Sequence, residues 1–172
     1  MLPDAPSICR LHLDFMKWAD NLMLQMVHKV DAPVVERNEG VSFQSILGTV
    51  QHIYRGERLW YRRVTEDPTM QMAAIETPSL NDLMDLWPRH HDEWRHWAAE
   101  LNQDGWFRSI LIRNSAGLEA YSPYWQIVLH LVNHGTYHRG QIVSLVKQAG
   151  FPVVSTDLIA YYRSLAAKAA VT

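Results

Sequence analysis

YWQIVLHLVNHGTYHRGQIVSLVKQAG, residues 124–150, is the stretch that decides the fold. Its apolar residues recur at i, i+3 and i+4, the spacing of one face of an amphipathic helix, and include Ile127, Leu131, Ile142 and Leu145. His130, His134 and His138 follow at four-residue steps, so each lies about 6 Å further along the helix. His134 and His138 interrupt the apolar stripe. Two imidazoles on a core-facing surface are best explained by a metal ion.

The residues that flank this stretch predict where the helix begins and ends. Ser122 followed by Pro123 is typical of an N-cap with proline at the first helical position. Gly150 followed by Phe151 and Pro152 is typical of a helix stop. Before the helix, residues 106–121 alternate weakly around the turn-forming sequence NSAG and predict a small β-hairpin.

Three further stretches carry apolar residues at helical spacing and predict long helices. We expect them at residues 7–30, 42–65 and 79–102, with a shorter helix from 155 or 156 to 170. Ser7 and Ser42 are the expected N-caps of the first two, and Ser79 with Asp82 forms a capping-box pattern at the third. Residues 34–40 are expected to form a loop, and residues 66–78 a long connection.

These elements predict an all-α fold, a four-helix bundle with a short extra C-terminal helix and a β-hairpin before the fourth long helix. No repeat or linker divides the chain, so we expect residues 1–172 to form a single domain. The connections at 66–78 and 103–121 are long enough for more than one topology. Periodicity alone does not choose between them.

Composition bounds the function. The 16 lysines and arginines and the 18 aspartates and glutamates give a net charge of −2. This charge does not favour binding to nucleic acid or to an anionic membrane. Cys9 is the single cysteine, and no secretory signal or apolar run of membrane-spanning length is present. We therefore expect a soluble, cytoplasmic protein.

Two histidines do not hold a metal well, so a third ligand must come from another helix. By pattern alone the candidates are His12, His28, His52, His90, His91 and His96. Glu93-x-x-His96 matches half of a di-iron carboxylate site, but residues 124–150 contain no glutamate to complete one. We interpret most of the cluster of histidines at 90–96 as lying on a solvated face.

Four stretches resemble one family. The string His130-Leu-Val-Asn-His134-Gly-Thr-Tyr-His138-Arg-Gly-Gln141 closely resembles the signature of the DinB-like family, part of the DinB/YfiT-like metalloenzyme superfamily. Residues 15–21 (FMKWADN), 47–57 (LGTVQHIYRGE) and 156–163 (TDLIAYYR) look like that family as well. The resemblance covers nearly the whole chain.

The resemblance implies a bundle of DinB/YfiT type, often a homodimer, with a divalent metal ion held by three histidines. Those ligands correspond to His52, His134 and His138. His130 corresponds to a position that often carries histidine without binding the metal, which favours a role lining the pocket. Asp20, Asn21 and Tyr137 are further candidates for pocket lining. We interpret Arg139 and Gln141 as packing or hydrogen-bonding residues, and Gly135 and Gly140 as points of close helix approach.

Three functions are compatible with these residues. The first is a metal-dependent enzyme in which the ion activates water or a low-molecular-weight thiol, with hydrolase-like or S-transferase-like chemistry, as in characterised relatives of the superfamily. The second is a non-enzymatic, metal-stabilised bundle that binds a small ligand or serves a stress response. The third is a structural protein in which the histidines belong to the core. Three imidazoles suit zinc or nickel best, with iron and copper as alternatives, and the small-molecule substrate is unknown.

Overall fold

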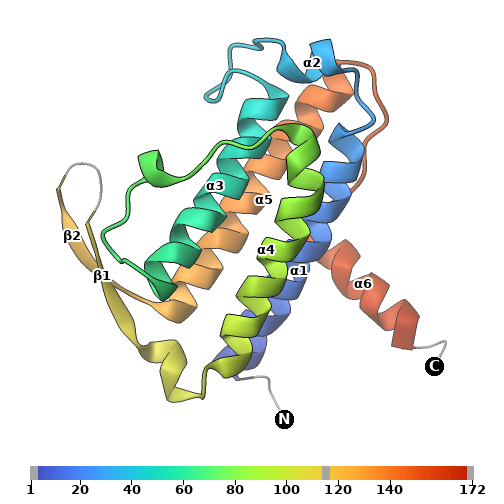
Figure 1. The fold of residues 1–172 in the computed structure, drawn as a ribbon. Helices are drawn as coiled ribbons and strands as arrows, with labels where there is room; N and C mark the ends of the chain where they lie inside the picture. The colour runs from blue at the N-terminus through green and yellow to red at the C-terminus, as the bar shows by residue number, and fades with distance from the viewer. Residues whose placement is uncertain (1–3, 114–116, 170–172) are drawn as a thin grey trace.

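The computed structural model describes residues 4–113 and 117–169, and the four long helices form a bundle (Figure 1). The long helices are α1 (Ala5–Val27), α3 (Ile46–Thr65), α4 (Leu80–Glu100) and α5 (Tyr124–Gln148). The shorter helices are α2 (Ala32–Glu36), α6 (Leu158–Ala169) and the 3-10 turns η1 (Met72–Ala74) and η2 (Asp104–Phe107). Strands β1 (Ser109–Arg113) and β2 (Glu119–Pro123) form an antiparallel hairpin before α5. The expected all-α fold, with its hairpin and its extra C-terminal helix, is confirmed.

The order and direction of the helices establish the topology of the bundle, which the periodicity of the sequence did not predict. In the view of Figure 1, α1 and α5 run upward while α3 and α4 run downward. Each long helix contacts two others: α1 packs on α4 and α5, and α3 packs on α4 and α5. The connection between α3 and α4 therefore returns along the length of the bundle, and the topology is not a simple up-down-up-down arrangement.

Several helix ends differ from those expected. Asp4, not Ser7, caps α1: its side chain accepts a hydrogen bond from the Ser7 amide, and the helix begins earlier than predicted. Ser45, not Ser42, caps α3 by accepting from the Gly48 amide at 3.0 Å. Both stretches hold more than one residue able to cap, and only the backbone path decides which side chain faces the free amides.

Proline explains two further differences. Residues 32–36 form helix α2 where a loop was expected, because Pro33 lies in the first turn, where its missing amide hydrogen costs nothing. Pro123 is itself the N-cap of α5, and Ser122 belongs to β2. The capping box of Ser79 with Asp82 is confirmed, and the stop at Gly150 has the expected positive φ of 87°.

The interior is divided along the bundle axis into two apolar clusters. One cluster lies at the end of the bundle where α1 and α5 end and includes Met23, Ile53 and Ile142; the other lies at the opposite end and includes Phe15 and Leu131. Between them, at the middle of the four long helices, lie the buried charged residues Asp20, Glu57, His91 and Arg139. A polar layer at this depth requires internal partners, because water cannot satisfy it.

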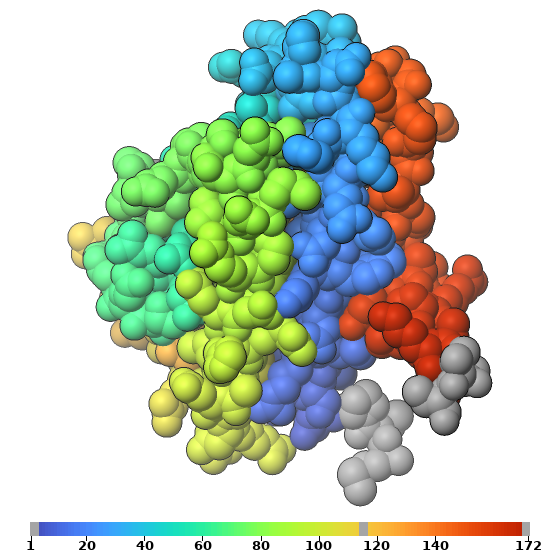
Figure 2. Space-filling view, turned by 45° about the vertical axis from the view of Figure 1, so that its right-hand side comes forward, coloured from blue at the N-terminus to red at the C-terminus, as the bar shows by residue number. Residues whose placement is uncertain are grey.

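Helix α6 lies against the lower half of α1, beside the face that α1 and α4 form together (Figure 2). Its anchor is Tyr161, which is 6% exposed. The Tyr161 ring lies 5.8 Å from the ring of Phe15 and 5.4 Å from that of Trp18. In the described part of the chain, no helix is both long and apolar enough to cross a membrane.

We predict that Ser45→Ala lowers the free energy of unfolding by about 1 kcal/mol, because it removes the side chain that accepts the Gly48 amide hydrogen bond. Ser42→Ala should change it by much less, because Ser42 is exposed and does not cap α3. Urea unfolding of both variants measures the difference. Equal destabilisation by the two substitutions would contradict the assignment of the cap.

Candidate metal centre

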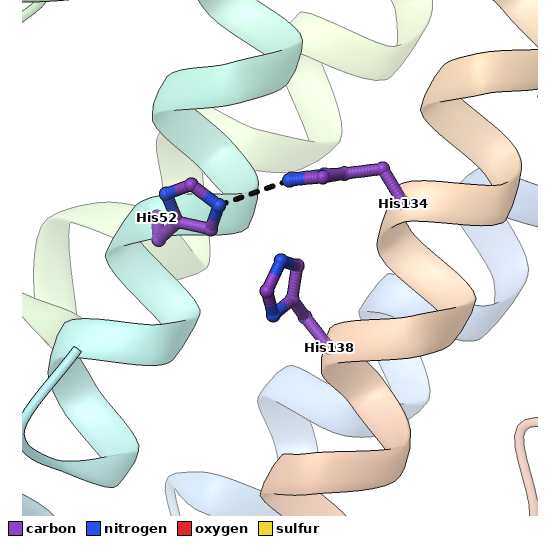
Figure 3. Close-up of side chains that lie close together, drawn as sticks. All are labelled: His52, His134 and His138. Atoms are coloured by element: carbon purple, nitrogen blue, oxygen red, sulfur yellow. Dashed lines mark hydrogen bonds between the residues drawn. The ribbon is translucent and has the colours of Figure 1, made fainter. Parts of the chain in front are cut away.

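Three histidines from two helices converge on one point. His52 lies on α3, and His134 and His138 lie on successive turns of α5 (Figure 3). The Nε2 atoms of His52 and His134 are 2.9 Å apart, and one nitrogen from each of the three rings lies within 4.8 Å of the others. Two nitrogens bound to a single zinc ion at tetrahedral angles are roughly 3.4 Å apart, so this spacing suits one ion.

The packing of α3 on α5 produces this convergence. His134 and His138 project from α5 toward α3, the helix that carries His52 and on which α5 packs. Gly56 on α3 leaves room for His134, since a Cβ at that position would lie only 3.3 Å from His134 Cε1. Gly48 has a different role: a Cβ there would lie 2.1 Å from the Phe43 carbonyl oxygen.

Burial and neighbouring charges keep His52 and His134 neutral. Partial burial, the nearby His138 and Arg55 lower the pKa of His52 to about 4. Partial burial and the neighbouring histidines His138, His52 and His130 lower the pKa of His134 to about 3. Neutral rings retain the lone pairs that bind a metal ion, so these residues fit a divalent cation at neutral pH.

Gln141 fixes the third imidazole. His138 Nδ1 donates to Gln141 Oε1 at 2.8 Å, because a carbonyl oxygen can only accept. The proton on Nδ1 leaves Nε2 of His138 with its lone pair free, which is the tautomer that a metal ligand needs. Phe43 adds an apolar wall: its ring stacks on His52 at 3.7 Å and meets the edge of His138 at 5.4 Å.

The other expected pocket residues lie at varying distances from the three nitrogens. Tyr137 is 65% exposed, with its ring 4.9 Å from that of His138. His130 is exposed and stands between Trp60 and His134, with ring separations of 5.5 and 5.7 Å, outside the convergent set. Asn21 is half-buried on α1, a helix that carries none of the three histidines.

Asp20 does not line the metal pocket but belongs to the buried polar layer. Arg139 Nη1 donates to Asp20 Oδ1 at 2.7 Å, and His91 Nε2 donates to Asp20 Oδ2 at 3.2 Å. The same His91 nitrogen lies 3.5 Å from Glu57 Oε2, which also accepts from Trp87 Nε1 at 2.7 Å. One charged or titratable side chain from each long helix thus meets at the centre of the bundle.

The charges in this layer balance. Burial alone would raise the pKa of Asp20, but the Arg139 guanidinium and the hydrogen bond from His91 lower it. Burial alone would lower the pKa of His91, but hydrogen bonds to Asp20 and Glu57 raise it to about 9. Burial and the Asp20 carboxylate raise the pKa of Glu57 to about 7. Two carboxyl groups therefore face two cationic side chains.

Asp20, Glu57 and His91 also lie close enough together to hold a metal ion. The guanidinium of Arg139 already supplies positive charge to Asp20, so a divalent cation there would be opposed by a fixed charge. The layer is better suited to hold the helices together than to bind a metal. Among the described residues, no arginine or lysine is hydrogen-bonded to the three-histidine cluster, although Arg55 lies one turn of α3 from His52.

The sequence interpretation missed this layer. His90 and His91 are 2% and 1% exposed, so their expected place on a solvated face is wrong, whereas His96 is exposed as expected. The sequence contains one indication of this layer, a charged residue within an apolar stripe. Glu57 follows Val50 by seven residues and so lies two turns along the same face of α3. Buried charges at such positions require partners on neighbouring helices.

The two glycines of α5 differ in their surroundings. A Cβ at position 135 would lie 2.7 Å from Arg139 Nη1, so Gly135 lets the arginine fold back along its own helix toward Asp20. Around Gly140 no described atom of another helix lies within 4 Å of an added Cβ, so the expected close helix approach there is wrong.

Comparisons with known proteins agree with this architecture. The model of the DinB family matches residues 9–168. The chain is 21% identical over 152 residues to Protein DinB of Bacillus subtilis (strain 168), an alignment that covers 84% of this chain and 87% of that protein. No solved structure gives a significant match to the chain.

We predict that Gln141→Ala lowers metal affinity about tenfold to hundredfold, because His138 loses the partner that fixes its tautomer and ring orientation. Gln148→Ala is the matched control, since Gln148 is exposed on the same helix. Competition with a chromophoric chelator measures both affinities. An unchanged affinity in Gln141→Ala would rule out this orienting role.

We also predict that metal-free protein loses stability as the pH rises from about 6.5 to about 9. The pKa of His91 is 6.5 in the unfolded chain and about 9 in the folded one. The contribution of His91 to the free energy of unfolding is therefore complete below pH 6.5 and is lost as the pH rises through about 9. Glu57, with its raised pKa, acts in the same direction between about 4.5 and 7.

Urea unfolding at a series of pH values measures this slope. His91→Gln should reduce the slope of stability against pH above pH 6.5. His96→Gln, which changes an exposed residue on the same helix, should leave the slope unchanged. Parallel profiles for the wild type and His91→Gln would show that the buried imidazole does not carry the extra proton.

Proposed function

The chain belongs to the DinB family, and on this basis we propose that it is a divalent-metal-dependent enzyme with His52, His134 and His138 as metal ligands. The observation that carries the proposal is the convergence of three imidazoles at the α3–α5 contact, where the pKa values of His52 and His134 are lowered to about 4 and about 3. Three ligands leave coordination positions for water or substrate, which is typical of catalytic rather than closed structural sites.

A divalent ion at this site would lower the pKa of a bound water or thiol and so supply a nucleophile near neutral pH. The residues of the chain provide the setting for that chemistry. Gln141 holds the proton on His138 Nδ1, and burial keeps His52 and His134 unprotonated. Phe43 shields one face of His52 from water. We propose hydrolase-like or S-transferase-like chemistry, with a low-molecular-weight thiol as the cosubstrate in the second case.

Zinc and nickel are the metals we propose first, since imidazole nitrogens suit both, with iron and copper as alternatives. We further propose that the protein acts in the cytoplasm as a homodimer on a small-molecule substrate, without nucleic-acid or membrane partners. The net charge of −2 supports the last part, because phosphate backbones and anionic lipids attract basic surfaces.

We predict about one metal ion per chain in untagged protein. His52→Ala and His134→Ala should lose it, because each removes one of three ligands. His130→Ala is the matched control, as it removes a neighbouring imidazole outside the convergent set and should retain the metal. Elemental analysis of the purified variants measures occupancy. Equal metal content in His52→Ala and the wild type would contradict the assignment of His52 as a ligand.

Turnover separates an enzyme from a metal-stabilised binding module. Metal-loaded protein is assayed with a panel of thiols, each paired with an electrophile, and with ester and amide substrates for hydrolysis. Turnover that is present in His130→Ala and absent in His134→Ala supports the enzyme. Stoichiometric metal and tight ligand binding without any turnover would support the binding module instead.

A further inference from the structure

A recess of about 700 Å³ opens beside the three-histidine cluster. Its walls are residues 42–45, 47 and 48, the side of α3 at Gln51, His52 and Arg55, and the connection between α3 and α4 (the crossover segment, residues 66–79) at Met72 and Thr77. The volume lies within the range of small-molecule sites. His52 is the one member of the cluster that lines the recess, so the recess approaches the candidate metal centre from the α3 side.

Arg55 lies in this recess one helical turn after His52. Its Nε donates to the Ile75 carbonyl oxygen at 3.2 Å, and one terminal nitrogen donates to the Met72 carbonyl oxygen at 3.1 Å. These two bonds fix the plane of the guanidinium and use Nε and Nη2. Its Nη1 hydrogens remain available for a ligand, because an arginine has five N–H donors and carries its charge at any physiological pH.

The charge of Arg55 is not neutralised by a carboxylate. Further along the same helix, Arg58 pairs with Glu93 and Arg62 with Glu66. Arg55 has backbone carbonyl partners instead, and in the described part of the chain no ion pair includes it. Glu36 also lines the recess, on its α2 side, without an ion pair to Arg55. A half-buried cation in a recess favours an anionic ligand.

The loop that forms the opposite wall is held in an unusual conformation. Gln44 has a φ of 68°, in the left-handed region that a residue with a side chain rarely adopts. Backbone bonds hold it there: the Gln44 amide donates to the Val41 carbonyl oxygen at 2.8 Å, and its own carbonyl accepts from the Glu39 amide at 2.7 Å. Strain maintained in this way is characteristic of ligand-binding loops, and it places Gln44 in the wall of the recess.

We infer that this recess binds the anionic group of a substrate, a carboxylate or a phosphate, through the guanidinium of Arg55. The role of the anion as part of a substrate rests on the proposed function, but anion binding itself does not require the metal. With the anionic group at Arg55 and the reacting group toward His52, the ligand would span about one turn of α3. Arg55 then acts as a specificity-determining residue.

The test uses inorganic phosphate and succinate as probes, with succinamide as the uncharged analogue of succinate. Each is titrated calorimetrically into full-length, untagged protein, metal-free and metal-loaded. Both anions should bind with one site per chain, and succinamide should not. Arg55→Gln should weaken anion binding about tenfold to hundredfold in both forms, because a charged hydrogen-bond partner is lost. Glutamine keeps a donor for one of the two backbone carbonyls.

Two variants control for loss of structure. Arg63 is another arginine of α3, and its Nε donates to a backbone carbonyl of the crossover segment, that of Met70, at 2.9 Å. Because Arg63 lies outside the recess, Arg63→Gln should leave anion binding unchanged. Arg55→Lys keeps the charge and should bind the anions more tightly than Arg55→Gln. Binding equal to the wild type in Arg55→Gln, or equal weakening by Arg55→Gln and Arg55→Lys, overturns the inference.

The outcomes also distinguish this inference from the proposed function. Stoichiometric metal together with wild-type protein that binds neither anion overturns the anion site and leaves the metal enzyme standing. Anion binding that depends on Arg55 in protein that takes up no metal supports the anion site and overturns the metal enzyme. Anion binding that is lost with His134→Ala but not with Arg55→Gln places the anion on the metal and overturns the role of Arg55.

Discussion

The buried ion pair between Asp20 and Arg139 is the interaction on which the candidate site depends. It joins α1 to α5 at the centre of the bundle, with both side chains fully buried. Successive residues on a helix point about 100° apart, so turning Arg139 toward α1 turns His138 toward α3. Gly135 leaves room for the arrangement, because a Cβ there would lie 2.7 Å from Arg139 Nη1 and would force the guanidinium to shift. The ion pair thus sets the rotation of α5 that aims its histidines.

Such a layer is costly unless every charge is compensated, because the apolar clusters above and below it exclude water. Compensation comes from all four long helices: Glu57 and His91 extend the network, and Trp87 donates to Glu57, although Glu57 Oε1, His91 Nδ1 and Arg139 Nε have no hydrogen-bond partner within the described part of the chain. Replacing one partner leaves an unpaired buried charge, whereas shifting one helix along its axis separates all of them. The layer therefore favours a single register of the four helices, and a metal centre assembled from two helices needs that register.

The sequence predicted the helices and the histidines more readily than the layer that positions them. Spacing alone identified His134 and His138, while His52 came from the resemblance of its stretch to a family. The layer was missed because charged residues within amphipathic helices usually face solvent, and only the packing shows that His91 meets Asp20. The predictions of the helix ends were wrong for a related reason. Ser42 and Ser45 are equally able to cap, and the left-handed turn at Gln44 decides between them.

The two polar centres differ in their balance of charge, and that difference bears on the chemistry. In the central layer, carboxylates face cations and the sum is near zero. At the candidate metal centre, lowered pKa values keep His52 and His134 neutral, and the amide of Gln141, not a carboxylate, orients His138. A divalent ion bound there would keep its full charge, and Arg55 lies one turn away. Since no ion pair on the described chain neutralises Arg55, and Glu36 is the one carboxylate that lines the recess, a substrate that carries a negative group would be attracted to both cations.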